Sequence, residues 1–362
     1  MRRRPLLLGA VCLPVLAQEA EATRVPLVPG LTVVTALHEP GVGDYESVKR
    51  LAARMQRPAP GWRIDYRASL PAGQVQSTRL QSDADLASAT VYRSRFESDT
   101  EEHYPGSTAL GMSAAVLRAL RTSGSTPFTV VEAPEWLRQP ASAGAGALAL
   151  ARALTAVELL LRGELKAAVP PTGTQPVLVN GRVVDLSVRW AEGLLTARDG
   201  TRVAVRLAVL DDDANPLALA WRIAAAQLTV VRLDWPRPDA GTALAGELKR
   251  TGRAALPGLY FDFGQATLQP GSDATISACV QALKSLPGRW RVEGHTDAIG
   301  REPANRALSL ARSQAVRQAL VTRDPALAAR LESSGLGAVR PVGDNATADG
   351  RARNRRVELV QL

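Results

Sequence analysis

Residues 289–312, RWRVEGHTDAIGREPANRALSLAR, join a short strand pattern, a polar loop and the start of a helix. Apolar and polar residues alternate from Trp290 onward, which predicts a strand, and Gly294 ends the alternation. Pro303 is well placed to open a helix, because proline is tolerated in the first helical turn. Apolar residues then recur at helical spacing, so we expect a helix over 303–320.

Polar side chains gather at the end of this strand and along one face of this helix. Thr296 and Asp297 follow the strand directly, where side chains leave the core. Asn305, Ser309 and Arg312 stand at positions i, i+4 and i+7, so they share one face of the helix. Together, the two groups bring a carboxylate and a guanidinium to one shallow site.

The GHTD loop followed by an N-x-x-L-S-x-x-R helix resembles the C-terminal peptidoglycan-binding domain of the OmpA family. Two flanking segments agree with the resemblance, YFDFG at 260–264 and GRARNRRV at 350–357. Four segments in the right order make the resemblance specific, and it covers residues 257–362. The residues before this range resemble only uncharacterised parts of bacterial OmpA-family proteins.

The resemblance implies an OmpA-like βαβαβ domain, with helices packed on one face of a mixed sheet. The alternation of strand and helix patterns in residues 257–362 predicts the same arrangement. We expect strands at 259–263, 289–295, 332–336 and 355–361, and helices at 272–286, 303–320 and 325–331.

A ligand with an ammonium and a carboxylate on one carbon would suit this polar site. Peptidoglycan stem peptides carry such a residue, diaminopimelate, in most Gram-negative bacteria. Asp297 can supply the fixed anion and Arg312 the planar cation, because a guanidinium grips a carboxylate with two parallel hydrogen bonds. The resemblance implies these roles. It further implies that Asn305 hydrogen-bonds the ligand and that Thr296 and Leu308 line the site. It also implies that Arg355 closes the site.

A structural role for the same residues is the alternative. Asp297 could cap the following turn and Arg312 could pair with it, since most ion pairs are neither buried nor functional. For an isolated pair we would favour that interpretation, but the surrounding motif favours ligand binding. We expect His295 to be structural, because it has no second metal ligand nearby in the sequence. The resemblance implies that His295 orients the loop. No metal or other cofactor is expected.

Residues 18–238 are expected to form a β-rich region of unknown function, a sandwich or a barrel-like structure. The clearest signal is Asn180-Gly181 between two apolar runs at 177–190, which predicts a hairpin. The patterns also predict strands at 62–68, 85–97 and 126–133, a short helix at 113–121, and a helix or turn at 44–55. The segment 148–169 fits a helix and a strand equally well.

The predicted organisation is an α+β multidomain chain. A Pro-rich piece at 235–238 leads into a linker expected at 239–256, before the domain at 257–362. Residues 1–17 are typical of a signal peptide, with three arginines, an apolar stretch and Val-Leu-Ala at the end. A lipoprotein signal would need a small residue directly before Cys12, so we favour cleavage after Ala17 over lipidation.

These features predict a non-catalytic protein of the periplasm that is associated with the cell wall, and with the outer membrane only through a partner docked on its N-terminal region. The net charge of +9 suits an anionic wall or membrane surface. The basic residues are scattered rather than clustered, so no nucleic-acid partner is expected. Two alternatives stay open. One is a periplasmic enzyme with its chemistry in the β-rich region, and the other is an accessory wall anchor of a secretion or motility machine. A partner in the envelope could dock on the N-terminal region.

Overall fold

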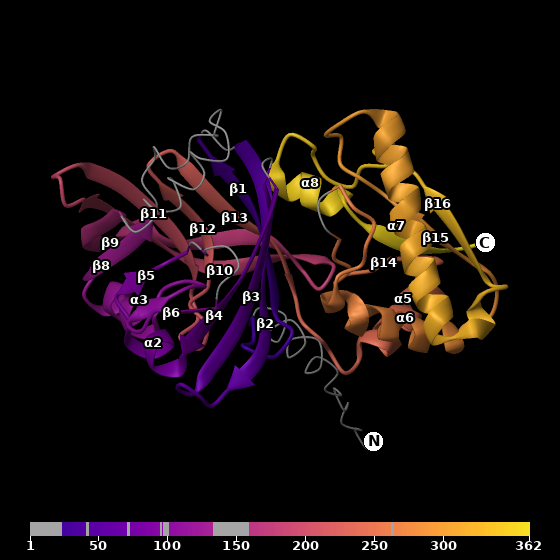
Figure 1. The fold of residues 1–362 in the computed structure, drawn as a ribbon, viewed down its shortest axis with the longest axis horizontal. Coiled ribbons are helices and arrows are strands. Elements are labelled where there is room, and N and C mark those ends of the chain that lie inside the picture. Colours follow the sequence, from indigo (N-terminus) through magenta and orange to yellow (C-terminus); the bar gives the residue numbers. More distant parts are fainter. Residues whose placement is uncertain are drawn as a thin grey trace, which may run out of the picture.

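The computed structural model describes residues 24–40, 43–70, 73–94, 96, 101–132, 159–261 and 264–362. The predicted signal peptide at 1–17 lies outside the described residues. The described chain forms a large β-rich N-terminal region and a smaller α/β C-terminal region, which lie side by side (Figure 1). Within this part of the chain, no helix combines the length and the apolar character needed to span a bilayer.

The N-terminal strands form one sheet, in the order β6-β4-β3-β2-β1-β13-β12-β11-β10-β9-β8-β5-β7. Their bounds are β1 (Thr32–Glu39), β2 (Gly43–Met55), β3 (Gly61–Leu70), β4 (Gly73–Ser82), β5 (Val91–Tyr92), β6 (Glu101–His103), β7 (Ser107–Thr108), β8 (Ser125–Glu132), β9 (Leu159–Val179), β10 (Arg182–Thr196), β11 (Arg202–Leu210), β12 (Ala218–Ile223) and β13 (Ala226–Asp234).

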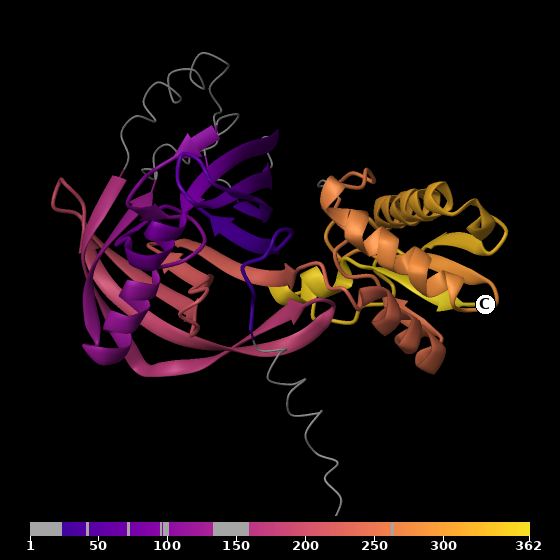
Figure 2. The same ribbon diagram turned by 90° about the horizontal axis from the view of Figure 1, so that it is seen from below.

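This sheet curls into a partial barrel (Figure 2). Strand β13 pairs with β1 and β12 and, at its end, also with β9 in a parallel pairing, which closes the ring from β9 to β13. Helices α2 (Asp83–Ser88) and α3 (Ala114–Thr122) lie against the sheet, and α3 adds Val116, Leu117 and Leu120 to the core. Of the two predicted alternatives, the barrel-like one is therefore formed.

The β9–β10 hairpin is confirmed where Asn180-Gly181 predicted it. Val179 pairs with Arg182 across a two-residue turn. Asn180 and Gly181 have φ values of 44° and 85°, the left-handed conformation that this turn type requires. Because the turn fixes the register, it sets the alternation of faces along both long strands.

Two predicted elements of the N-terminal region are wrong. The stretch 44–55, predicted as helix or turn, is strand β2, whose inward positions Ser47 and Lys49 are polar and so mask the alternation that marks a strand. The strand pattern at 85–97 begins inside helix α2, which is capped by the Ser82 hydroxyl. The ambiguous segment 148–169 is strand from residue 159 onward, and its earlier part lies outside the described residues.

The C-terminal region packs helices on a mixed four-stranded sheet with the order β14-β17-β15-β16. Strands β15 and β16 are parallel, whereas β17 is antiparallel to β14 and β15. A single core of buried side chains joins the helices to the sheet, including Trp290 and Leu320. The element bounds are α5 (Ala240–Thr251), β14 (Arg253–Ala255), η2 (Pro270–Ser272), α6 (Asp273–Lys284), β15 (Trp290–Gly294), α7 (Glu302–Arg323), η3 (Pro325–Leu327), β16 (Leu331–Gly335), α8 (Ala348–Asn354) and β17 (Val357–Gln361).

The predicted linker at 239–256 needs correction, because it forms helix α5 and strand β14. Leu248, Ala254 and Leu256 from this stretch are buried in the C-terminal core. The strand predicted at 259–263 is also absent from the described part of that segment, where Phe261 makes one isolated bridge to Leu268. Its place at the sheet edge is taken by β14, which pairs with β17.

The two regions touch through a small apolar cluster and through several polar contacts. Val34 and Val231 of the barrel pack against Tyr260 and Ala352. The buried Tyr260 hydroxyl donates a hydrogen bond to Oδ2 of Asp234 at 2.7 Å. Arg232 donates to the carbonyl oxygen of Ala352 at 3.3 Å, at the end of α8.

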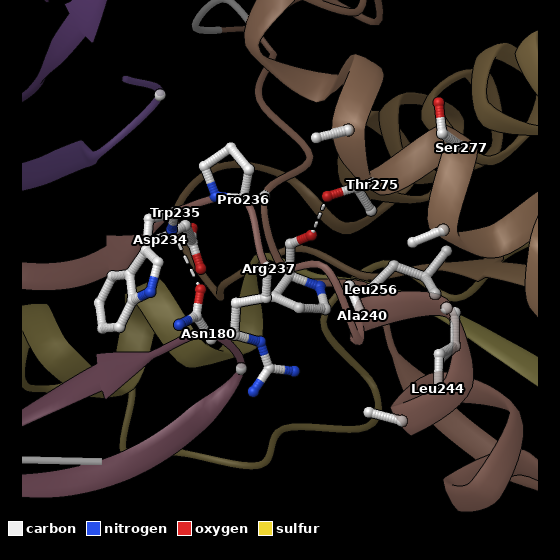
Figure 3. A pocket seen from close by; sticks show the side chains of 18 of the residues that line it. Asn180, Asp234, Trp235, Pro236, Arg237, Ala240, Leu244, Leu256, Thr275 and Ser277 are labelled. Atoms are coloured by element: carbon white, nitrogen blue, oxygen red, sulfur yellow. Dashed lines mark hydrogen bonds between the residues drawn. The ribbon is translucent and has the colours of Figure 1, made fainter. Parts of the chain in front are cut away.

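A cavity of about 330 Å³ lies where the connection between the regions passes the β9–β10 turn (Figure 3). Asn180 at the turn accepts a hydrogen bond from the backbone N–H of Trp235 at 3.1 Å. Helices α5 and α6 form the opposite wall, with Leu244 and Ser277. None of the predicted site residues lines this cavity.

Candidate functional site

The site begins where strand β15 ends against helix α7. Gly294 is the last residue of the strand, and a Cβ atom there would lie 2.1 Å from the carbonyl oxygen of Ser309. Only glycine allows this approach, so the helix lies directly on the strand end. The Ser309 hydroxyl accepts a hydrogen bond from the N–H of Gly337 at 2.9 Å. The GHTD loop is therefore held beside the first turns of α7.

Asp297 is buried, with 8% of its surface exposed, and both of its carboxylate oxygens are engaged. Oδ1 accepts from the N–H of Ile299 at 3.0 Å, and Oδ2 pairs with the guanidinium of Arg355. Asn305, buried in the first turns of α7, donates to the carbonyl oxygens of Asp297 at 3.3 Å and Ile299 at 3.0 Å. The side chain of Asn305 thus fixes the loop that presents the carboxylate.

Arg312 lies on α7, two turns after Asn305, and its side chain is partly buried. Its guanidinium stacks over the ring of Phe261, 4.9 Å from the centroid, and its Nε donates to the carbonyl of Gln265 at 2.9 Å. Burial and the nearby charge of Arg355 lower the pKa of Arg312 to about 10, and the carboxylates of Asp297 and Glu46 oppose that shift. Arg312 therefore remains a cation at neutral pH.

Arg355 bridges two carboxylates, one from the N-terminal region and one from the C-terminal region. One terminal nitrogen pairs with Asp297 and the other with Glu46 of strand β2. Burial lowers the pKa of Arg355, but the adjacent carboxylates outweigh burial and the net shift is upward. Sequence reasoning missed Glu46, because 309 positions separate it from Arg355 and only the domain arrangement joins them.

The two remaining predicted site residues, Thr296 and Leu308, differ in their contacts. The backbone N–H of Thr296 donates to the carbonyl of Gly337 at 2.9 Å, while its buried hydroxyl has no partner among the described residues. Leu308 is half-buried on α7 and lines neither of the two cavities beside the arginines.

Arg312 and Arg355 line two cavities, both with walls from the N-terminal and C-terminal regions. One has a volume of about 120 Å³ and includes Glu46 and Arg67 of the barrel. The other, of about 310 Å³, is lined by His295 and by Val183 near the β9–β10 turn. The charged cluster therefore lies at the boundary of the two regions rather than on an open face.

His295 lies at the centre of a buried group with Glu293 and Glu358, whose potential ligand atoms are within 4.8 Å of one another. Burial and the charge of Arg356 lower the pKa of His295 to about 4, against the opposing effect of Glu358. A metal cation is not favoured there, because guanidinium groups already surround the two carboxylates. Those arginines, at 2.6 to 3.9 Å, are Arg253, Arg291, Arg340 and Arg356.

In comparisons with known proteins, the similarity of the relatives described below lies in the C-terminal region. Outer membrane porin F of Pseudomonas aeruginosa is 43% identical over 99 residues, which are 27% of this chain and 28% of that protein. The peptidoglycan-binding protein ArfA of Mycobacterium bovis is 40% identical over 109 residues, 29% of this chain and 33% of that protein. Both relatives are thus matched over a third or less of their own length.

A solved structure covers the same region. The peptidoglycan-associated lipoprotein from Burkholderia pseudomallei is 34% identical, covers 29% of this chain and 88% of that chain, and has a TM-score of 0.27. The family model described as "OmpA family" matches residues 260–355, which hold Asp297, Asn305, Arg312 and Arg355. Residues 260–355 are therefore an OmpA-family domain.

Proposed function

We propose that this chain is a non-catalytic cell-envelope protein that binds peptidoglycan stem peptides at the cluster of Asp297, Arg312 and Arg355. The observation that carries the proposal is a buried, fixed carboxylate that interacts electrostatically with two partly buried guanidinium groups, within the family-matched residues. A relative at 40% identity over this region, ArfA, is named a peptidoglycan-binding protein.

The chemistry of the cluster suits the diaminopimelate of the stem peptide. In the proposed complex, Asp297 accepts hydrogen bonds from the ligand ammonium, and Arg312 donates to the ligand carboxylate. Phe261 supports the flat face of the guanidinium at 4.9 Å, which favours an in-plane bidentate contact. Asn305 acts on the ligand through the loop, because its side chain holds the carbonyls of residues 297 and 299.

In this proposal, the C-terminal domain binds the wall and thereby positions the N-terminal barrel there. The two regions have separate cores, one within residues 25–233 and one within residues 248–359. A region with its own sheet and core can fold alone, so residues 239–362 are suitable for binding experiments. The proposed location is the periplasm, against the wall.

The test is calorimetric titration of residues 239–362 with a diaminopimelate-containing stem peptide, beside a stem peptide that carries lysine at the same position. The lysine peptide lacks the second carboxylate, so we expect only the diaminopimelate peptide to bind well. Asp297→Ala and Arg312→Ala should each lower affinity by roughly 30-fold or more, because each leaves a charged ligand group unpaired.

The matched control is Arg306→Ala, which removes an exposed arginine from the same helix. It should bind as the wild type does. A folded wild-type fragment that binds neither peptide, or that binds both equally, would overturn the proposal.

A further inference from the structure

Glu46 belongs to the β-rich region, yet its carboxylate lies in the charged cluster of the OmpA-family domain. The side chain of Glu46 is 33% exposed, and its Oε1 pairs with one terminal nitrogen of Arg355. The other terminal nitrogen of Arg355 pairs with Asp297, whose side chain is 11% exposed. Glu46 and Arg312 also line the same cavity, and the nearby carboxylate of Glu46 acts to raise the pKa of Arg312.

The charges in the cluster indicate which group of the ligand Glu46 resembles. The OmpA-family domain alone brings two cations, Arg312 and Arg355, and one anion, Asp297, to the cluster. A second anion is needed for neutrality in a partly buried setting, where an unpaired charge is costly. In the closed arrangement, Glu46 provides that anion. In the proposed complex, the ligand carboxylate would take the place of Glu46 beside the guanidinium groups, while the ligand ammonium pairs with Asp297.

The space around the cluster agrees with competition rather than with joint binding. The cavity that contains Glu46, Arg312 and Arg355 measures about 120 Å³. Ligand pockets usually start at about 300 Å³, so this one has no room for an amino-acid side chain with two charged ends. The cavity of about 310 Å³ beside the same two arginines is lined by neither Glu46 nor Asp297. Strands β1 to β4 and β13 form its N-terminal wall, through residues such as Arg67 and Gln76.

The apolar part of the contact between the two regions is small. Its apolar cluster has four buried members in the part of the chain that the structure describes, Val34, Val231, Tyr260 and Ala352. The core of the C-terminal domain has seventeen by the same measure. Small interfaces between domains allow relative motion, whereas large apolar ones do not.

We propose that Glu46 is an intramolecular competitor for the wall-binding site. Its carboxylate occupies the position of the ligand carboxylate, and strand β2 must move away before a stem peptide binds. This inference rests on the proposed function of the site. It makes peptidoglycan binding and separation of the two regions a single coupled event, because the same guanidinium groups cannot serve both carboxylates.

The test is titration of the full chain with the diaminopimelate stem peptide, in the wild type, in Glu46→Gln and in a matched control, Asp44→Asn. The control removes the same charge from the same strand, but Asp44 is 62% exposed and pairs with His38 rather than with the cluster. Glu46→Gln should tighten binding about tenfold, because the fraction of chains with a free site rises. Asp44→Asn should leave the dissociation constant unchanged.

A second measurement separates the possible failures. Residues 239–362 lack Glu46 and should bind at least as tightly as Glu46→Gln in the full chain. If this fragment binds but Glu46→Gln matches the wild type or binds more weakly, the competition is refuted while the proposed function stands. If the folded fragment does not bind, the proposed function fails and this inference fails with it. Small-angle scattering should also show the wild-type chain expanding when the peptide is added, and a constant radius of gyration would count against competition.

Discussion

Acidification should destabilise the C-terminal domain through one buried residue, His295. The imidazole is 2% exposed, and both ring nitrogens lack a hydrogen-bond partner among the described residues. Burial, together with Arg356, Arg253 and Arg340, holds the pKa of His295 at about 4, although Glu358 acts in the opposite direction. The folded domain therefore keeps this ring neutral at pH values where an unfolded chain would protonate it.

The sign and the size of the effect follow from that difference. Between pH 6.5 and pH 4, the unfolded chain binds a proton that the folded domain does not, so stability falls as the pH falls. A difference from 6.5 to about 4, at about 1.4 kcal/mol per pKa unit, corresponds to roughly 3 kcal/mol. Nearly all of that loss should be complete at pH 4, and none of it should be present above pH 7.

Urea unfolding of residues 239–362 from pH 4 to 7.5 measures this effect. Trp290 is the one tryptophan in that fragment and is 1% exposed, so its fluorescence reports loss of the core. His295→Gln keeps a polar side chain but cannot titrate in this range. Its free energy of unfolding should lack the roughly 3 kcal/mol decline of the wild type. Parallel pH profiles for the two proteins would refute the reasoning, since groups such as Glu358 titrate in both.

Three further predictions concern packing and burial. Gly294→Ala should lower the melting temperature sharply, because the new Cβ would lie 2.1 Å from a backbone oxygen of α7. Gly246→Ala is the control in the same melting experiment. It should be neutral or stabilising, because open space surrounds this position on α5. Cys279 should resist thiol reagents at pH 8 in the folded 239–362 fragment and react after denaturation, because burial raises its pKa to about 12; rapid labelling of the native fragment would contradict this. Glu102→Gln should cost the full chain about 3–5 kcal/mol in chemical denaturation, because it removes the carboxylate that pairs with the buried Arg79, whose side chain is 2% exposed; a cost below 1 kcal/mol would show that the pair is not needed.

The strands and helices from Trp290 to the end of the chain follow the sequence closely, because local signals agree there. The alternation that ends at Gly294, the proline at the start of α7 and its apolar repeat all favour the same elements. Helix α8 was not predicted. Its seven residues contain three charged ones, and Thr347 caps it in a way that a loop would also allow.

The barrel was harder to predict because its interior is partly polar. Lys49, whose ammonium donates to the backbone carbonyls of Ser94 and Ala109, is buried on β2. Arg79 on β4 is likewise buried and pairs with Glu102. Inward positions occupied by charged residues break the alternation on which a strand prediction depends. Strand order was not accessible, since pairings such as β1 with β13 join residues about 200 positions apart.

Only the part of the candidate site that lies within the C-terminal domain could be predicted from the sequence. Asp297, Asn305 and Arg312 lie close together in sequence, and in the structure Asn305 donates to the carbonyl of Asp297 while Arg312 follows two turns later on the same helix as Asn305. The bridge from Arg355 to Glu46 depends on how the two regions dock, and no local pattern around Glu46 marks it. Long-range electrostatic partners of this kind require the fold itself.

The connection between the regions has a consequence for the kind of ligand the site could sense. Five residues, Trp235 to Asp239, separate the end of β13 from the start of α5, and fully extended they span about 17 Å. Such a short tether would keep the competing carboxylate at an effective concentration in the millimolar range even after separation. Dilute peptides released during wall turnover could not match that concentration, whereas stem peptides packed in an intact wall could. On this account, the length of the tether makes the domain a detector of ligand density rather than of ligand presence.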